Sequence, residues 1–337
     1  MANRDVLAIG TSAGGVEALL FLAKRLPKNF PAAILVTIHL PSQARSSLDE
    51  ILSRAGPLPA TFAEQGASVA KGRIFIAPPG RHLLLDGDTL SLGVGPHENN
   101  VRPAVDPMLR SAAVCCGYRA VGAVLTGTQD DGASGLWVMN QCGGITVIQD
   151  PKDAAFPEMP LNALQRAKPQ HIVKLADMPA LLERLVHQSA GQPTPAPKSL
   201  QYEVEVARSG HSTMNDMDRI GRRSVLTCPD CQGTMWEIDE DDLVRYRCHV
   251  GHAYTEETMA LGLEENLRRA LGSALRALDE RIALAEKLKR QASQHGNHKL
   301  AQHWNSRRKE FETEADVIRQ AIKRADDIDV TQRGAAE

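Results

Sequence analysis

The chain has 337 residues, of which 42% are hydrophobic, and its formal net charge at neutral pH is −2. This length predicts two or three domains with enough apolar residues for a core. The nearly balanced charge gives no electrostatic reason to expect nucleic acid or a membrane surface as a partner. The segment around Arg4 and Asp5 lacks the apolar run of a signal peptide, and no apolar run approaches the roughly 20 residues of a membrane span. We therefore expect a cytoplasmic protein that neither inserts into a membrane nor binds nucleic acid.

Strand and helix patterns alternate from the N-terminus to about residue 188. Buried-strand patterns cover residues 6–10, 32–38, 73–77, 82–85, 90–92, 120–126, 145–148 and 171–174. Helical patterns cover residues 16–26, 43–54, 105–116, 133–141 and 180–187. Because Asp86-Gly87-Asp88 separates two of the strands, residues 83–92 are predicted to form a hairpin. The alternation as a whole predicts an α/β fold with a doubly wound, mainly parallel sheet.

Three of these strands end at residues that a serine hydrolase needs. The first runs into the sequence GTSAGG, which contains Ser12; the second stops at His39; the third is followed by GTQDDG, in which Asp131 precedes the glycine. The carboxyl ends of the strands in an open parallel sheet meet at one edge, so a nucleophile, a base and an orienting carboxylate are expected together. The G-x-S-x-G turn would present Ser12 beside a helix N-terminus, where an oxyanion can be held.

Each residue also has a plainer interpretation. A G-x-S-x-G match occurs as an ordinary tight turn or a phosphate loop, His39 could make a simple strand-end hydrogen bond, and Asp131 could be a helix N-cap. Only the conjunction of the three favours catalysis. Their chain order, Ser, His, Asp, differs from that of the α/β-hydrolases, and the nucleophile follows the first strand, so that fold is not expected.

The first 190 residues resemble the catalytic domain of CheB-type protein-glutamate methylesterases. The resemblance rests on the segments IGTSAGGVEAL, TIHLP, IFIAPPGRHL, RPAVDPML, VLTGTQDDGASG and FPEMPLNAL, which occur in the order found in the family. It implies that Ser12 is the nucleophile, His39 the base and Asp131, rather than Asp130, the orienting acid.

The resemblance also implies a reaction and its partners. The reaction is hydrolysis of glutamyl methyl esters on chemoreceptor-type signalling proteins, with deamidation of receptor glutamines as a related activity and no cofactor for catalysis. Backbone N–H groups near Ala13 and Thr128 would hold the oxyanion, and Arg102 would either position the substrate or make a structural ion pair. Ala13 replaces a threonine common in the family, and Thr128 replaces a common methionine, which leaves the substrate preference open.

Two further expectations follow from the resemblance. Well-known members carry an N-terminal receiver domain, whereas here the first catalytic strand begins at residue 6, so we expect no receiver to precede it and no control by phosphorylation within the chain.

Two alternatives to the methylesterase stay open: a serine esterase for another ester, and a non-catalytic module that binds partners of a chemosensory-type pathway.

A second motif follows a Pro-rich and polar segment, residues 191–223, which is predicted to be a linker. Cys228 and Cys231 form a C-x2-C pair, and Cys248 and His252 form a C-x3-H pair, a spacing typical of structural zinc sites. His249 is the weaker candidate ligand because it directly follows Cys248. Four ligands leave no open position for catalysis, and a redox pair or free thiols are the alternatives. We therefore predict a zinc ribbon at residues 224–254, after a catalytic domain at residues 1–190.

Residues 255–328 have the pattern of an α-helical hairpin. Apolar residues recur every three or four positions after Thr255, a candidate N-cap, and His295-Gly296-Asn297 interrupts the pattern. Trp304, Phe311 and Ile318 then repeat at intervals of seven. Such a hairpin could form a dimer, dock a signalling partner or fold back on the ribbon.

Overall fold

The computed structural model describes residues 3–41, 46–240 and 243–334. The chain divides into two compact units, residues 1–259 and residues 260–337. The segment that contains Cys228, Cys231 and Cys248 therefore belongs to the same unit as the N-terminal sheet.

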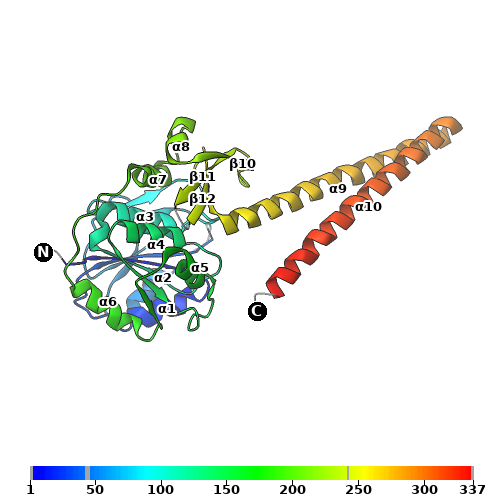
Figure 1. Ribbon diagram of the computed structural model, residues 1–337. Coiled ribbons are helices and arrows are strands. Elements are labelled where there is room, and N and C mark those ends of the chain that lie inside the picture. Colours follow the sequence, from blue (N-terminus) through cyan, green and yellow to red (C-terminus); the bar gives the residue numbers. More distant parts are fainter. Residues whose placement is uncertain (1–2, 42–45, 241–242, 335–337) are drawn as a thin grey trace. The chain divides into compact units, whose positions relative to one another are not determined.

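The core of the first unit is a seven-stranded parallel sheet (Figure 1). Its strands, in spatial order, are β3 (Ala60–Phe62), β4 (Ile74–Ile76), β2 (Ala33–Ile38), β1 (Val6–Thr11), β7 (Ala120–Val124), β8 (Ile145–Gln149) and β9 (His171–Val173). The chain starts at β1 in the middle, builds outwards through β2, and later returns to the other side of β1 with β7. This reversal confirms the predicted doubly wound architecture, and β1, β2 and β7 flank the point at which open α/β sheets form a ligand crevice.

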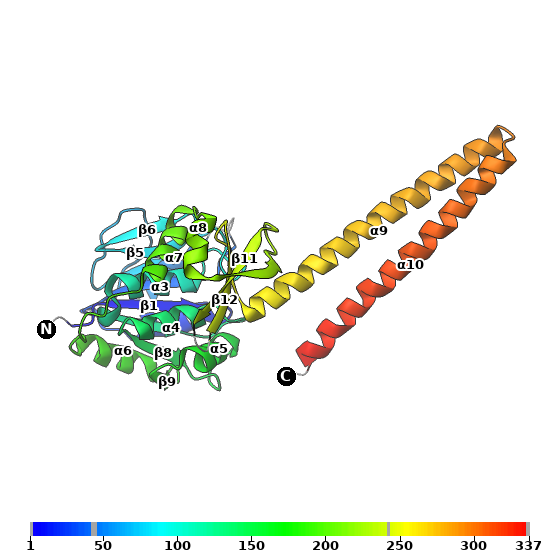
Figure 2. The ribbon, with the colours of Figure 1, turned by 45° about the horizontal axis from the view of Figure 1, so that its top comes forward.

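Helices cover both faces of the sheet, as Figure 2 shows. One core contains residues of α1 (Gly15–Ala23), α2 (Leu48–Ala55) and α6 (Met178–His187). The other contains residues of α3 (Val105–Cys116), α4 (Ala133–Gln141), α5 (Glu158–Ala167) and the antiparallel hairpin of β5 (His82–Asp86) and β6 (Thr89–Gly93). A short 3-10 turn (Gly117–Arg119) joins α3 to β7. Because β1 and β2 are fully buried, their sequences are continuous apolar runs rather than alternating ones.

The structure differs from the sequence predictions at a few elements of this unit. Helix α2 begins at Leu48 rather than residue 43, and residues 43–45 of the predicted helix lie outside the described part of the chain. The patterns did not reveal β3 or α5. Strand β3 has only three residues, too few for a recognisable period, and α5 follows Pro157 and contains Pro160.

Residues 191–223 are not only a linker. They contain α7 (Lys198–Ser209) and α8 (Met214–Ile220). Leu200, Val204 and Ala207 recur at helical spacing on α7 and are buried. The carbonyl of Ala207 accepts the N–H of Gly95, so this helix is hydrogen-bonded to the loop after β6. The burial of so few apolar residues explains why the segment looks polar in sequence.

A second sheet follows, with four antiparallel strands: β10 (Arg222–Thr227), β11 (Thr234–Glu240), β12 (Leu243–Cys248) and β13 (Ala253–Thr255). A buried cluster of charges connects it to the first sheet. Glu98 lies in the loop before α3, Arg110 on α3, Glu203 on α7, and Arg245 and Arg247 on β12, and their side chains are at most 4% exposed.

The cluster alternates carboxylates and guanidinium groups. Arg247 Nη2 lies 3.0 Å from Glu98 Oε1 and 2.9 Å from Glu203 Oε2, while Arg110 pairs with Glu98 at 3.1 Å. Burial alone would raise the pKa of Glu98, but Arg110 and Arg247 lower it to about 2. These side chains therefore stay ionised and depend on one another, because an unpaired buried charge is strongly destabilising.

The second unit is an antiparallel pair of helices, as predicted. Helix α9 (Glu256–Gln294) and α10 (His298–Gly334) are separated by the expected break at residues 295–297. Arg319 on α10 pairs with Asp279 on α9 at 2.9 Å, and Phe311 and Ala315 are buried. Hydrophobic side chains such as Leu267 and Leu284 nevertheless stay exposed.

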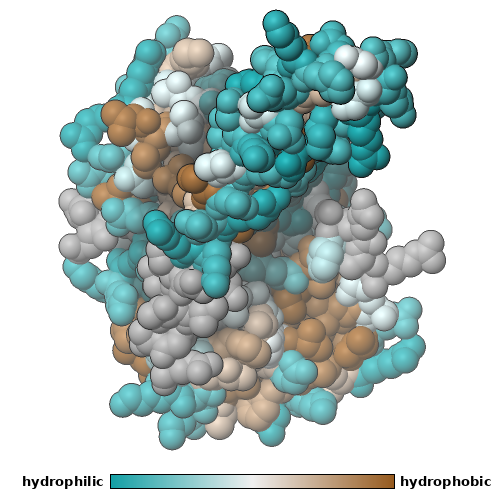
Figure 3. All heavy atoms as spheres, turned by 90° about the vertical axis from the view of Figure 1, so that its right-hand side faces the viewer, coloured by the Kyte–Doolittle hydropathy of each residue, from teal (hydrophilic) through white to brown (hydrophobic). Residues whose placement is uncertain are grey.

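On the face drawn in Figure 3, hydrophilic residues predominate and hydrophobic residues gather in separate patches. Within the described ranges, none of the helices has the length and apolar character required to cross a bilayer.

The charge cluster generates a stability prediction. Glu203→Ala leaves three buried guanidinium groups with Glu98 as the remaining carboxylate of the cluster, so it should lower the free energy of unfolding by about 3–5 kcal/mol. Glu50→Ala, which removes an exposed pair with Arg54, should cost less than about 1 kcal/mol. Denaturant unfolding of both variants measures this difference. Equal effects would show that the buried cluster contributes no more than a surface pair.

Candidate active site

Ser12 lies in a tight turn between β1 and α1. The Ser12 N–H donates to the Thr126 carbonyl on the neighbouring segment (3.1 Å), and the Gly15 N–H donates to the Ser12 carbonyl (2.9 Å). Gly14 caps α1 with φ 72°, a left-handed conformation that favours glycine. At Gly127, a Cβ atom would lie 2.9 Å from Ser12 Cβ, so only a glycine lets the two turns approach this closely. The sequence GTSAGG therefore produces the predicted strand-to-helix elbow.

Two backbone N–H groups near Ser12 are available to a ligand. Between the described residues, neither the Ala13 N–H nor the Thr128 N–H takes part in a backbone hydrogen bond. Ala13 belongs to the turn that follows β1 and Thr128 to the turn that follows β7, and the two turns approach each other at Ser12 and Gly127. Free amides close to the N-terminus of a helix are suited to holding an anion.

His39 follows β2 and pairs directly with Asp131. His39 Nε2 lies 2.7 Å from Asp131 Oδ2, and the His39 side chain is 16% exposed while that of Asp131 is 1% exposed. An ionised carboxylate only accepts hydrogen bonds, so Nε2 carries the proton in the neutral ring and Nδ1 is left as the basic nitrogen. Among the described residues, no hydrogen bond joins the side chains of Ser12 and His39. In enzymes without bound substrate, the hydrogen bond between nucleophile and base is often long and shortens only when substrate binds.

Asp131 accepts four hydrogen bonds. Its Oδ2 accepts from His39 and from the Val105 N–H (2.6 Å), and its Oδ1 accepts from the Asp106 N–H (3.0 Å) and Asn99 Nδ2 (3.1 Å). Burial opposes the charge of Asp131, but the His39 contact and the amides of the α3 N-terminus lower its pKa. The carboxylate is thus ionised and fixed in orientation.

Asp106 accepts hydrogen bonds from the first backbone amides of α4, as Asp131 does from the first amides of α3. Its Oδ1 accepts the N–H groups of Gly132 (3.0 Å) and Gly135 (2.6 Å), in the first turn of α4. Burial and the charge of Asp131 raise the pKa of Asp106 to about 8. Near neutral pH the pair therefore carries its negative charge on Asp131, where it faces His39.

A cavity of about 370 Å³ opens beside His39. Its other walls include His97, Asn100, Val101 and Arg102, all from the loop before α3. Arg102 donates to the carbonyls of Gly95 (2.7 Å) and Val94 (3.2 Å). This predicted substrate residue therefore lines the cavity while its guanidinium also holds the loop.

Sequence reasoning missed Asn99 and Asp106, which contact Asp131, and Thr258, which contacts Asn99; Thr255 was predicted only as an N-cap. Asp106 fell inside the motif RPAVDPML, but nothing in a single sequence indicates that its carboxylate caps another helix. Asp130 was assigned no role; the Thr255 hydroxyl donates to it, and Arg166 lies 4.0 Å away.

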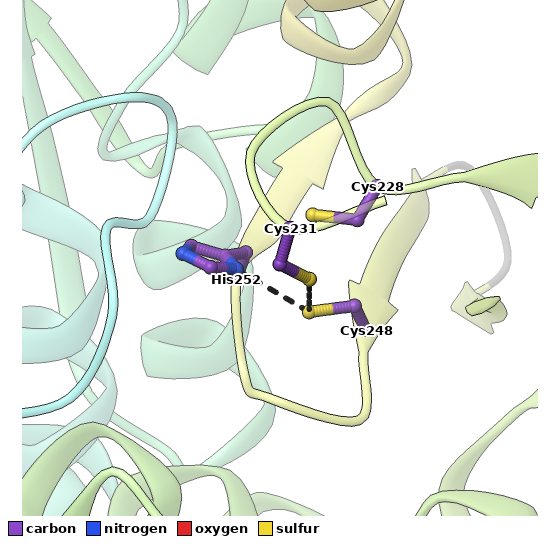
Figure 4. Close-up of side chains that lie close together, drawn as sticks. All are labelled: Cys228, Cys231, Cys248 and His252. Atoms are coloured by element: carbon purple, nitrogen blue, oxygen red, sulfur yellow. Dashed lines mark hydrogen bonds between the residues drawn. The ribbon is translucent and has the colours of Figure 1, made fainter. Parts of the chain in front are cut away.

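The four predicted metal ligands meet in one cluster (Figure 4). Their ligand atoms all lie within 4.8 Å of one another; Cys231 Sγ is 3.6 Å from Cys248 Sγ, which is 3.4 Å from His252 Nδ1. Bonds of about 2.3 Å to sulfur and 2.0–2.1 Å to nitrogen in a tetrahedron give ligand separations close to these. The other nitrogen, His252 Nε2, faces Asp230 at 3.6 Å, as expected for a metal-bound imidazole. His249 packs against Gly233 instead and is outside the cluster.

Comparison with known proteins agrees with this architecture. The CheB methylesterase family matches residues 7–182. The chain belongs to the CheB methylesterase family. A relative from Shewanella denitrificans, named protein-glutamate methylesterase/protein-glutamine glutaminase 2, is 38% identical over 189 residues, which are 55% of this chain and 53% of that protein. A relative of the same name from Hahella chejuensis is 39% identical over 48% of this chain and 45% of its own length.

The solved structures contain a matching fold. The CheB methylesterase catalytic domain of Thermotoga maritima aligns with a TM-score of 0.53 and 31% identity, covering 55% of this chain and all of that domain. The chain spans about half the length of the curated relatives it matches. The shared part is the CheB-type sheet with its helices.

The two adjacent aspartates should respond oppositely to pH. Burial raises the pKa of Asp130 to about 6, despite the hydrogen bond from Thr255 and the charge of Arg166. An acid with a raised folded-state pKa destabilises the fold once pH rises through that value. Asp130→Asn should therefore stabilise the protein by at most about 3 kcal/mol near pH 8 and little near pH 4.

Asp131 provides the matched comparison. Because its pKa is lowered in the folded state, its contribution is present at high pH and lost as pH falls. Asp131→Asn should then destabilise the protein near pH 8 and much less at low pH. Denaturant unfolding at both pH values measures the two effects, and a pH-independent change for either variant would contradict the assignment.

Proposed function

We propose that this protein is a serine hydrolase that cleaves glutamyl methyl esters on chemoreceptor-type signalling proteins. The observation that carries the proposal is the pairing of His39 with the ionised, four-fold hydrogen-bonded Asp131 at the strand edge where Ser12 emerges. The named activity of the relatives from Shewanella and Hahella supports the substrate class. Their names also include glutaminase, so deamidation of receptor glutamines is part of the proposal.

The proposed reaction uses each residue at a stated atom. Ser12 Oγ attacks the side-chain carbonyl carbon of the ester and gives its proton to His39 Nδ1. The free N–H groups of Ala13 and Thr128 support the resulting oxyanion. His39 then returns the proton to the leaving methoxide, which departs as methanol, and the same base activates a water that releases Ser12 and the glutamate side chain. Asp131 holds the His39 tautomer and stabilises the imidazolium throughout.

The cavity beside His39 is the proposed binding site for the substrate side chain. Its walls come from a loop that carries Arg102, so a carboxylate neighbouring the ester on the receptor would meet a positive charge there. We also place the protein in the cytoplasm, because its six cysteines are unpaired, which suits a reducing compartment.

The decisive experiment is methanol release from a methylated receptor cytoplasmic domain. Ser12→Ala should lower the rate by at least about 10⁴-fold, because loss of the nucleophile removes the covalent route. Ser293→Ala, an exposed serine on α9, is the matched control and should leave the rate unchanged. If the wild-type chain releases no methanol, the activity proposal fails and the partner-binding interpretation replaces it.

We further propose that Cys228, Cys231, Cys248 and His252 bind a structural zinc ion. The ion would crosslink the two turns that join the strands of the second sheet. Elemental analysis should find about one zinc per chain, and Cys231→Ser should lose it and become more sensitive to protease near residue 230. Cys115→Ser, outside the cluster, should retain the metal. Equal zinc contents in the two variants would contradict the assignment.

A further inference from the structure

Strand β13, the last strand of the second sheet, is hydrogen-bonded to the loop before α3, which carries Asn99. The Asn99 N–H donates to the carbonyl of Ala253 in β13 (2.8 Å), and the Ala253 N–H donates to the His97 carbonyl (3.4 Å). Glu98 and Ala253 form a parallel bridge at the same point. The loop before α3 is therefore held by the backbone of β13.

Two buried threonines, Thr255 at the end of β13 and Thr258 in the first turn of α9, contact Asp130 and Asn99. Thr255 and Thr258 are 1% and 0% exposed, and their hydroxyl oxygens lie 2.9 Å apart. The Thr255 hydroxyl donates to Asp130 Oδ2 while its oxygen accepts the Thr258 N–H, which caps the start of α9. The single hydroxyl proton of Thr258 is shared between Thr255 Oγ1 (2.9 Å) and Asn99 Oδ1 (3.4 Å). One face of this helix start is thus hydrogen-bonded to residues on both sides of the catalytic carboxylate.

The ionised Asp131 decides how the Asn99 amide is oriented, and the amide oxygen then faces Thr258. With the oxygen of Asn99 accepting from Thr258, its NH₂ group donates to Asp131 Oδ1 (3.1 Å) and to Asp106 Oδ2 (2.9 Å). A rotated amide would turn its oxygen towards the ionised Asp131, which has no proton to donate, and its NH₂ group towards Thr258. Without the hydroxyl donor the amide oxygen would be buried and unpaired, since Asn99 is only 3% exposed.

We propose that Thr258, with Thr255, is a positioning residue for the Ser12–His39–Asp131 site. It acts through Asn99, which fixes the plane of the Asp131 carboxylate and hence the direction of its hydrogen bond to His39. The second sheet and the start of α9 are then an integral part of the active site rather than a separate accessory module. This inference rests on the proposed serine-hydrolase function.

The test compares Thr258→Val, which removes the hydroxyl but keeps the shape, with Thr258→Ser, which keeps the hydroxyl. Thr258→Val should lower kcat for methyl-ester hydrolysis about 3–10-fold with KM unchanged, the rate equivalent of one lost hydrogen bond. Thr258→Ser should recover most of that loss. Thr313→Val, an exposed threonine on α10, controls for the substitution itself.

The same variants are assayed with p-nitrophenyl acetate, a small activated ester that tests Ser12 and His39 without a receptor. If the receptor ester is not the substrate, methanol release fails in the wild type, but the chromogenic assay still reports the positioning effect. Thermal unfolding separates a structural role. If Thr258→Val lowers the melting temperature but leaves kcat per folded molecule at the wild-type value, or if Thr258→Ser loses as much activity, the proposal is wrong.

Discussion

The crossed capping of two helices by two aspartates is the interaction on which the site depends. Asp131, in the turn before α4, accepts the first amides of α3, and Asp106, on α3, accepts the first amides of α4. Both carboxylates are buried, so neither can lose its partners without a large cost. These two caps fix the spacing of α3 and α4, and they place the ionised Asp131 within hydrogen-bonding distance of His39. Stability and chemistry are supplied by the same hydrogen bonds.

This arrangement explains the division of charge in the pair. Two buried carboxylates so close together cannot both ionise readily, and the site resolves the conflict by raising the pKa of Asp106 to about 8 and lowering that of Asp131. The difference comes from His39, which faces only Asp131. His39 therefore determines which of the two aspartates is ionised. The buried Glu98–Arg110–Arg247 contacts act further out, holding the loop that carries Asn99 and Arg102 against the second sheet.

The sequence was sufficient for the sheet, for the meeting of His39 with Asp131 and for the cysteine cluster, because each leaves a local signal. β1, β2 and β7 are continuous apolar runs, and their ends are marked by Ser12, His39 and the DDG turn. The C-x2-C and C-x3-H spacings similarly require only adjacent residues. The helical hairpin was visible from its period and from the break at residues 295–297.

What could not be predicted depends on contacts between residues far apart in the chain. Nothing near Asn99 indicates that its amide lies between Asp106 and Asp131, and Thr258 is more than 150 positions away in sequence from the asparagine it contacts. Helix α7 looked like part of a linker because its few apolar residues form a recognisable face only once they pack against α3 and the β5–β6 hairpin. In the sequence, Glu203 and Arg247 likewise resemble ordinary surface charges, because only the folded chain brings them together in a buried pair.

The most direct test of the central claim is the rate at which a fluorophosphonate probe labels the intact chain, followed by peptide mapping. The account predicts that the probe modifies Ser12 and that Asp131→Asn, compared at equal folded concentration, reacts slower by several orders of magnitude, because His39 loses the partner that fixes its tautomer. Labelling of a different residue, or equal labelling rates in the two proteins, would contradict it.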